Sequence, residues 1–288
     1  MQEPKKALTV AFLGPLGTYS HQAAYDRFGS SVEYHESGTI TDVFEAVASK
    51  TAHAGVVPQE NSIFGSVIET YDTLRRQNVP AIRGEIVLEV QHCLLARRGV
   101  KHEDIRYIKS HEQALGQCRG FLAQNFPNAS LEKVASTAAA AEAVLTSPDS
   151  AAICSKLCAT VFDGLEILFE GIQDRNSNFT RFYVLSTTLD SELPPSTLGQ
   201  TRCLVRLSWG AENKPSPSIA QLLTALGLSV SRLDRRPQLD GTLPFRDVYF
   251  AELAREDGGA NGPWMPHIER AIERVRESGG KAELLGIW

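Results

Sequence analysis

The chain has 288 residues, of which 42% are hydrophobic and 22% charged, and its formal net charge is −5 at pH 7. A chain of this length can form two domains or one large one, and its composition is that of an ordinary globular protein. The sequence contains no long basic run, so binding to nucleic acid or to an anionic membrane is not expected on electrostatic grounds.

The N-terminal segment and the cysteines indicate where the protein works. The first six residues are polar, no secretory apolar segment follows them, and the longest apolar stretches have only the length of a strand. These features predict a cytoplasmic protein without a membrane span. The odd number and wide spacing of the five cysteines predict buried free thiols rather than disulfides or a zinc site. They are Cys93, Cys118, Cys154, Cys158 and Cys203.

Strand and helix patterns alternate along the first two thirds of the chain. Short apolar runs bounded by turn residues predict strands at 8–13, 54–57, 86–96, 151–154 and 179–185. Apolar residues at helical spacing predict helices at 20–28, 41–50 and 137–145. Two further helices are expected after capping boxes, one formed by Ser66 with Glu69 and one by Ser110 with Gln113.

This alternation predicts an α/β fold, with a mostly parallel sheet and helices on both faces. A linker is expected at 190–200, where Pro194-Pro195-Ser196 lies in a stretch of low hydrophobicity. The part that follows, 201–288, shows strand (203–209), helix (218–226), strand (229–233), strand (248–253), helix (265–276) and strand (283–287) patterns. This βαββαβ order is typical of a ferredoxin-like domain.

The segment 174–185 holds the most informative polar side chains. Asn178, Thr180 and Arg181 come at the beginning of the predicted strand 179–185. An amide, a hydroxyl and a guanidinium at one edge of a sheet suit a small anionic substrate. An ordinary structural explanation is also open, because threonine is favoured in strands and Arg181 could pair with Asp174 or Glu170.

Two other segments offer similar groups. Gly17-Thr18-Tyr19-Ser20 is a turn that enters a helix, so free backbone N–H groups and the helix dipole favour an anion there. N-capping by Thr18 or Ser20 explains the same residues. Glu60-Asn61-Ser62 follows a strand at its carboxyl edge, where ligands of open α/β sheets collect, and an Asx-turn is the alternative. His111, at a helix start, is more typical of a capping residue than of a proton-transfer group.

Five segments, in this order, resemble the prephenate dehydratases. They are Gly14-Pro15-Leu16-Gly17-Thr18-Tyr19-Ser20, Pro58-Gln59-Glu60-Asn61-Ser62 with Gly65 and Val67, Ser110-His111 with Gln113-Ala114-Leu115, Ser136-Thr137-Ala138, and Thr180-Arg181-Phe182 preceded by Asn178. The resemblance implies a dehydratase domain at 1–189 with two α/β lobes and a cleft, like a periplasmic binding protein, the second lobe lying at about 86–168. The domain at 201–288 then resembles an ACT domain, an amino-acid-sensing module. Because no helical domain precedes Leu8, a fused chorismate mutase is not expected.

By this resemblance the chain is a monofunctional prephenate dehydratase of phenylalanine biosynthesis, a lyase that forms phenylpyruvate from prephenate. The enzyme must hold two carboxylates and help hydroxide leave, and no metal or cofactor is expected. The sequence contains neither a G-x-G-x-x-G after the first strand nor a Walker A lysine. The resemblance implies that Thr180 acts on the leaving hydroxyl, that Arg181 clamps a carboxylate, and that Phe182 packs beneath the site. The other residues expected at the substrate are Thr18, Tyr19, Ser20, Glu60, Asn61, Ser62 and Asn178.

The C-terminal domain carries an expected effector site. Leu233-Asp234-Arg235-Arg236-Pro237 resembles a Glu-Ser-Arg-Pro motif of the family, and Pro217-Ser218-Ile219 stands where many relatives have Gly-Ala-Leu. These segments are expected to bind L-phenylalanine as a feedback inhibitor in a homo-oligomer, either a dimer or a tetramer. Asp for Glu and Arg for Ser are departures from the family motif.

Two alternative functions remain open. An arogenate dehydratase shares the fold and chemistry but takes the amino-acid form of the substrate. A non-catalytic sensor would combine a two-lobed binding protein with the ACT-like domain. Asn178, Thr180 and Arg181 together argue against the sensor, which has no need for a hydroxyl that assists a leaving group.

Overall fold

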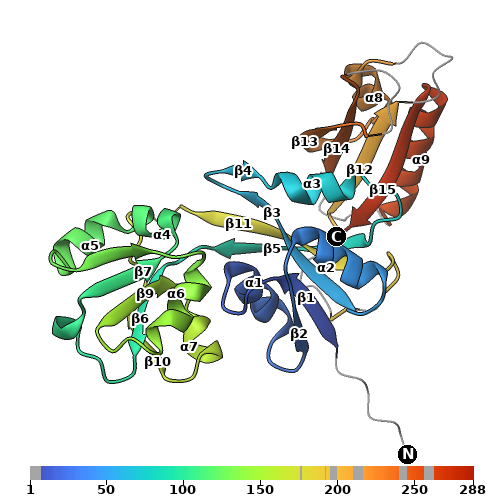
Figure 1. The fold of residues 1–288 in the computed structure, drawn as a ribbon. Helices are drawn as coiled ribbons and strands as arrows, with labels where there is room; N and C mark the ends of the chain where they lie inside the picture. Colours follow the sequence, from blue (N-terminus) through green and yellow to red (C-terminus); the bar gives the residue numbers. More distant parts are fainter. Residues whose placement is uncertain are drawn as a thin grey trace, which may run out of the picture. The chain divides into compact units, whose positions relative to one another are not determined.

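The structure is a computed structural model that describes residues 8–175, 177–191, 193–194, 200–209, 217–239, 245–255 and 263–288 (Figure 1). The chain divides into two compact units. Unit 1 takes its described residues from Met1–Val43, Val56–Gly65 and Ile86–Phe182, and unit 2 from Phe44–Gly55, Ser66–Glu85 and Tyr183–Trp288. Two segments from the first third of the chain therefore belong with its C-terminal part. The expected linker at 190–200 lies largely outside the described residues.

One sheet of unit 1 has the order β5-β11-β3-β1-β2. Its strands are β1 (Thr9–Leu13), β2 (Glu33–Ser37), β3 (Ala54–Asn61), β5 (Ala81–Glu89) and β11 (Phe179–Ser186), and the unit boundary cuts β3, β5 and β11. The strand β1 pairs with β2 in parallel, and its central residues are fully buried. Helix α1 (Tyr19–Phe28) begins after Thr18, and the Thr18 side chain caps it. Thr18 was one of the two predicted caps, the other being Ser20. Helix α2 (Ile40–Ala48) lies close to its predicted bounds.

The second sheet of unit 1 has the order β10-β6-β9-β7-β8. Its strands are β6 (Cys93–Arg97), β7 (Tyr107–Ser110), β8 (Ser130–Lys133), β9 (Ser150–Cys154) and β10 (Leu165–Phe169). The sheet is mixed, because β7 is parallel to β8 and β9 whereas β6 is antiparallel to β9 and β10. The expectation of a mostly parallel sheet does not hold here.

Helices cover both faces of this second sheet, as predicted. Residues of α4 (Glu112–Gln117) and α5 (Arg119–Asn125) pack against Leu94 and Ala96 of β6. Residues of α6 (Thr137–Val144) and α7 (Cys158–Val161) pack against Cys93 and Leu95 of the same strand. Successive side chains of β6 point to opposite faces of the sheet, and all four are apolar because helices cover both faces.

Several predicted elements differ from the structure. The expected strand 86–96 is two strands, β5 and β6, separated at 90–92. Neither predicted capping box forms. Helix α3 (Ile68–Leu74) begins after Val67 without a side-chain cap, since Ser66 lies in the short strand β4 (Gly65–Ser66). Helix α4 is capped by His111, because the buried Ser110 hydroxyl donates instead to the Ile153 carbonyl (2.6 Å).

Unit 2 contains the predicted βαββαβ order. Its elements are β12 (Arg202–Trp209), α8 (Ile219–Leu226), β13 (Val230–Pro237), β14 (Asp247–Ala254), α9 (Met265–Glu277) and β15 (Gly280–Ile287). The antiparallel sheet has the order β13-β14-β12-β15, and β5 adds beside β15 in parallel. Helices α8 and α9 cover one face, where residues such as Val205, Leu222 and Ile268 form a fully buried core.

Helix α3 packs on the opposite face of this sheet. The Tyr71 and Phe250 rings lie 5.3 Å apart, and Arg206 Nη1 donates to the Leu74 carbonyl (3.0 Å). Phe250 and Arg206 alternate along their strands with residues of the α8–α9 core, which places them on the α3 face. The two faces of the sheet are therefore covered by segments far apart in the sequence.

All five cysteines are free and buried, as predicted. Among the described residues, no helix combines the length and the apolar character needed to cross a membrane. Within the same residues, no group of three or more His, Cys, Asp or Glu side chains is placed to hold a metal ion.

Candidate active site

A cavity of about 330 Å³ in unit 1 is lined by residues at the ends of several strands and helices. Asn61 at the end of β3 and Thr180 at the start of β11 meet there, with Asn178 directly before β11. The first residues of α1, α4 and α6 complete the wall. The lining residues are Thr18, Tyr19, Asn61, Phe64, Val90, His92, His111, Gln113, Ala114, Gln117, Ala135, Ser136, Thr137, Asn178 and Thr180.

The Asn61 amide holds the Thr180 hydroxyl in one orientation. Asn61 Oδ1 accepts the backbone N–H groups of Ile63 (2.9 Å) and Phe64 (3.1 Å), so the nitrogen Nδ2 must face β11. There Nδ2 donates to Thr180 Oγ1 (3.0 Å), to Asn178 Oδ1 (2.8 Å) and to the Phe179 carbonyl (3.2 Å). Because Thr180 Oγ1 accepts from Asn61, its own proton is available for a ligand in the cavity.

A second hydrogen-bonded group, Tyr19–His92–Gln117, lines the same cavity. Tyr19 Oη lies 2.6 Å from His92 Nδ1, and Gln117 Oε1 lies 2.6 Å from His92 Nε2. Burial lowers the pKa of His92, so the ring is neutral near pH 7, and burial raises the pKa of the Tyr19 hydroxyl. A carbonyl oxygen at Nε2 requires the proton on that nitrogen, which leaves Nδ1 to accept from Tyr19.

The cavity has helix N-termini rather than cations in its wall. None of its described lining residues is Arg or Lys. Thr18 caps α1, and Ser136 caps α6 by accepting the Ala139 N–H (3.0 Å). The first N–H groups of these helices have no intrahelical partner, and each helix dipole is positive at this end. The site therefore favours a small anion without a fixed positive charge.

Gly17 fixes the turn that leads into α1. Its φ is +85°, and a Cβ there would lie 2.8 Å from Cys158 Sγ. Its N–H donates to His21 Nδ1 (3.0 Å), and its carbonyl accepts from Ser155 Oγ (2.9 Å) and Cys158 Sγ (3.3 Å). Only glycine combines this conformation with such close packing.

Sequence comparison assigns the chain to a family. The profile named "Prephenate dehydratase" matches residues 10–189, which is more than half of the chain. The chain belongs to the prephenate dehydratase family. This membership confirms the prediction of a lyase that was made from the five sequence segments.

Relatives over nearly the whole chain carry matching names. A "Bifunctional chorismate mutase/prephenate dehydratase" of Aquifex aeolicus is 33% identical over 289 residues, covering 99% of this chain and 74% of that protein. A "Prephenate dehydratase" of Lactococcus lactis subsp. cremoris is 31% identical, covering 97% and 96%. "Arogenate dehydratase 5, chloroplastic" of Arabidopsis thaliana is 35% identical, covering 80% and 54%.

A solved structure supports the same assignment. The chain is similar to a prephenate dehydratase of Arthrobacter aurescens in complex with L-Phe, with a TM-score of 0.76 and 27% identity. The alignment covers 97% of this chain and 89% of that one.

Five of the site residues that the sequence predicted for this member of the prephenate dehydratase family line the cavity. They are Thr18, Tyr19, Asn61, Asn178 and Thr180. Thr18 also caps α1 and Asn61 also forms the predicted Asx-type turn, so the two interpretations of each residue hold together. Asn61 is the last residue of β3, whereas the sequence predicted that it follows the strand.

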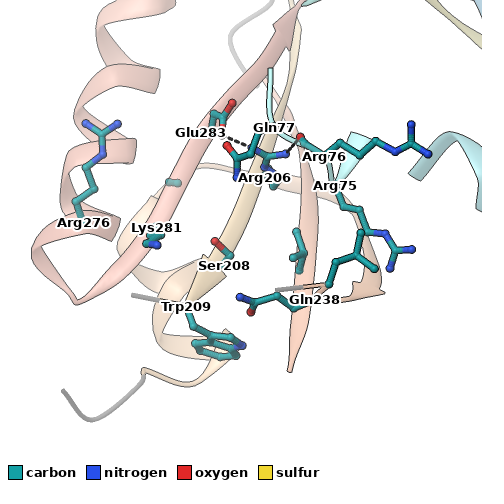
Figure 2. A pocket seen from close by; sticks show the side chains of 13 residues that line it. Arg75, Arg76, Gln77, Arg206, Ser208, Trp209, Gln238, Arg276, Lys281 and Glu283 are labelled. Atoms are coloured by element: carbon teal, nitrogen blue, oxygen red, sulfur yellow. Dashed lines mark hydrogen bonds and ion pairs between the residues drawn. The ribbon is translucent and has the colours of Figure 1, made fainter. Parts of the chain in front are cut away.

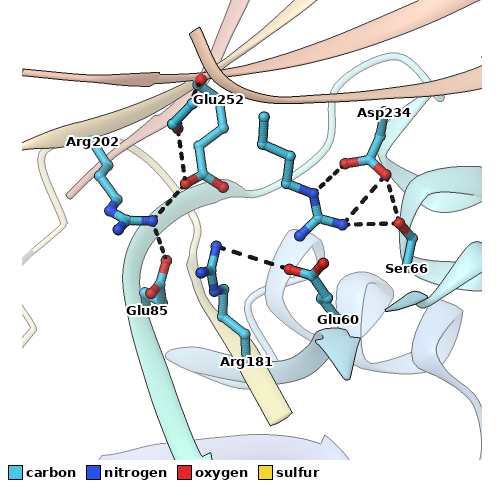
Figure 3. Close-up of polar contacts among 9 residues, drawn as sticks. Glu60, Ser66, Glu85, Arg181, Arg202, Asp234 and Glu252 are labelled. Carbon is cyan, nitrogen blue, oxygen red and sulfur yellow. Dashed lines mark hydrogen bonds and ion pairs between the residues drawn. The ribbon is translucent and has the colours of Figure 1, made fainter. Parts of the chain in front are cut away.

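The other five predicted residues do not line the cavity. Arg181 and Glu60 face each other across the sheet at 4.0 Å (Arg181 Nη1 to Glu60 Oε2; Figure 3), on the opposite strand faces from Thr180 and Asn61. The prediction that Arg181 clamps a carboxylate beside Thr180 does not fit this geometry. Phe182 and Ser20 are buried, and the Ser62 hydroxyl binds the backbone around Phe179.

Sequence reasoning missed His92 and Gln117 and gave Ser136 and Thr137 no role. Gln117 lies one helical turn after Gln113, so a reading of that helix face could have found it. Ser136 and Thr137 belong to a segment that resembles the family. His92 carried no sequence signal. His111 caps α4 by accepting the Gln113 N–H (3.3 Å), which confirms the capping interpretation, and it also lines the cavity.

Proposed function

We propose that this chain converts prephenate into phenylpyruvate in the cavity around Asn61 and Thr180. The ring carboxylate leaves as carbon dioxide, and the electrons of the broken C–C bond complete the aromatic ring as the C–O bond to the hydroxyl breaks. The hydroxide takes up one proton and leaves as water, so that a dianion and a proton give one monoanion, carbon dioxide and water. No redox step is involved.

The single observation that carries this proposal is the hydrogen bond from Asn61 Nδ2 to Thr180 Oγ1 (3.0 Å). It directs the hydroxyl proton of Thr180 toward the ligand, where it can be donated to the leaving oxygen. The hydrogen bond from Thr180 to the leaving oxygen strengthens as negative charge develops on that oxygen. Such a gain in the transition state is what accelerates a reaction.

Neutral donors are proposed to hold the two carboxylates. The free N–H groups at the starts of α1 and α6 provide one set, and Tyr19 and Thr137 from these turns line the cavity. An adjoining hollow shares Phe64, Gln117 and Asn178 with the cavity and also includes the exposed Arg175. Arg175 is thus a cation at the margin of the site that can attract a dianion.

Two assays test the proposal: an ultraviolet assay for phenylpyruvate formed from prephenate, and an amino-acid assay for phenylalanine formed from arogenate. Prephenate and arogenate are supplied separately to the wild type and to Thr180→Val. Turnover of prephenate that is strongly reduced by the substitution supports the proposal. Turnover of arogenate alone favours the arogenate dehydratase alternative, and no turnover of either favours a non-catalytic sensor.

The proposal for regulation is that 201–288 forms an ACT domain that binds L-phenylalanine, dimerises and inhibits the enzyme. The βαββαβ order and the relative whose structure contains L-Phe support it. Along β13, Leu233, Arg235 and Pro237 are exposed, and Leu233 has 41% of its surface accessible. This exposed face can accept a second copy or an effector. Ser218 caps α8 in a capping box and Ile219 begins that helix.

The opposite face of β13 is joined to α3 and to Ser66 of β4. Arg236 binds both oxygens of Asp72 (2.7 and 3.1 Å), and Ser66 Oγ donates to Asp234 Oδ1 (2.6 Å; Figure 3). The strand expected to sense the effector is therefore held by the segment that follows Asn61 in the sequence. We place this dimeric enzyme in the cytoplasm, where five free thiols stay reduced.

Asp72→Ala tests the regulatory proposal on the whole protein. Wild-type activity should fall in millimolar L-phenylalanine, with a coupling on the order of 1–3 kcal/mol. The variant should keep its basal activity and lose part of the inhibition. Wild-type activity that does not respond to phenylalanine would mean that this domain has no such effector role.

A further inference from the structure

One large cavity in unit 2 has no assigned role. It has a volume of about 780 Å³, and its wall includes Arg276 of α9 and the Trp209 ring (Figure 2). Arg206 and Ser208 of β12 and Lys281 and Glu283 of β15 contribute to its wall, together with residues that follow α3. A volume of this size accommodates an organic ligand.

The wall is strongly basic. Among the lining residues that the structure describes, five are basic and one, Glu283, is a carboxylate. That carboxylate is already paired with Arg206, whose side chain is only 6% exposed and is also held by the carbonyls of Leu74 and Arg76. Arg206 is therefore a fixed cation whose charge Glu283 balances, and the other charged residues of the described wall, Arg75, Arg76, Arg276 and Lys281, are all cations.

The remaining cations are held to different degrees, and Arg76 lies 3.9 Å from Glu45 in an exposed pair. Arg276 lies 3.3 Å from Glu273 in a pair that is more than half exposed, and such pairs contribute little. Lys281 forms no ion pair with any residue that the structure describes. Arg75 is bound to Asp72 (3.1 Å) and donates to the Pro237 carbonyl (2.8 Å), whereas its Nε is buried without a hydrogen-bond partner.

A second observation points to a ligand that accepts and donates hydrogen bonds. Gln238 Oε1 is also buried without a partner, and it lines the same cavity as Arg75. Buried polar atoms are normally satisfied by protein, water or ligand. The Trp209 ring and Leu239 add apolar surface to the wall, which suits the organic part of a ligand.

We propose that this cavity binds a small organic polyanion of the phosphate class, such as a phosphorylated metabolite. The phosphate groups bind Lys281 and Arg276, the Arg75 Nε supplies one further donor, and the organic part packs on Trp209. None of the expected effector residues at 218–219 or 233–237 lines the cavity, which borders the second of these segments at Gln238. It also shares no residue with the cavity around Thr180.

The experiment is isothermal titration of the full chain at low salt with two probes, inorganic pyrophosphate and ATP. Both probes carry the phosphate chemistry, and only ATP carries an aromatic base for Trp209. Tighter binding of ATP assigns the organic part to the site, and equal binding assigns the phosphate chain alone. In the double variant Arg276→Ala, Lys281→Ala, the affinity should fall about tenfold, because two partly exposed charge contacts are lost.

Arg270→Ala is the matched control. Arg270 is an exposed arginine of the same helix α9, its guanidinium binds the Pro266 carbonyl (3.1 Å), and it does not line the cavity. Its removal should leave the affinity unchanged, and all variants should retain basal turnover. The proposal is overturned if neither probe binds at millimolar concentration, or if the double variant binds as tightly as the control.

Discussion

Thr180→Val removes one hydroxyl from the proposed active site and keeps the shape of the side chain. The Asn61 amide has two protons for three acceptors, so it keeps Asn178 Oδ1 (2.8 Å) and the Phe179 carbonyl (3.2 Å) after the substitution. No buried donor is left without a partner. The free energy of unfolding should therefore change by less than about 1 kcal/mol.

The effect on turnover should be much larger. If the Thr180 hydroxyl donates mainly to the leaving oxygen in the transition state, its loss costs roughly 2.7–4 kcal/mol, or about 10²–10³-fold in kcat. KM should change little, because the hydroxyl contributes less to the bound ground state. The assay is phenylpyruvate formation from prephenate, with urea unfolding of the same preparation to confirm that the fold is intact.

Two companion variants sharpen this test. Thr180→Ser retains the hydroxyl and should recover most of the activity. Asn61→Asp has nearly the same shape, but its carboxylate accepts where the amide donated, so the Thr180 proton turns away from the ligand and kcat should fall as in the valine variant. A valine variant within about threefold of wild-type kcat, or a serine variant as slow as valine, would refute the assignment.

Three further predictions follow from the same unit. Arg181→Lys should leave KM unchanged because Arg181 faces Glu60 on the opposite strand face from the cavity, and a severalfold rise in KM would restore the carboxylate clamp. Burial lowers the pKa of His21 in the folded protein to about 4. Between this value and the ordinary histidine pKa of about 6.5, the unfolded chain binds more protons than the folded one. The free energy of unfolding should therefore fall by roughly 3 kcal/mol as the pH drops from about 6.5 to below 4. Urea unfolding of His21→Gln over that range should show a smaller slope, and an equal slope would assign the loss to other groups. Gly17→Ala should lower the thermal midpoint because its Cβ meets Cys158 Sγ at 2.8 Å at a positive φ, and an unchanged midpoint would show that the turn can relax.

The sequence by itself determined the elements that carry strong local signals. Buried strands such as β1 and β9, and helices with good caps or long apolar periodicity such as α6 and α9, lie close to their predicted bounds. Thr180, Asn61 and Asn178 were identifiable because five short segments in order resemble one family. The sequence missed β2, β7, β8 and β10. Of these, β2 and β8 lie at the edges of their sheets and carry mostly polar, exposed residues without an apolar alternation.

The tertiary structure alone decided which of the polar residues share a site. Thr180 and Arg181 are neighbours in the sequence, but the pleat of β11 sends them to opposite faces, and only the packing of the sheet shows which face borders the cavity. His92 and Gln117 are 25 positions apart and meet through one hydrogen bond. Likewise, β15 lies beside β5 because Gly286 lets the backbone approach Ile82, a close contact across about two hundred residues that no local pattern encodes.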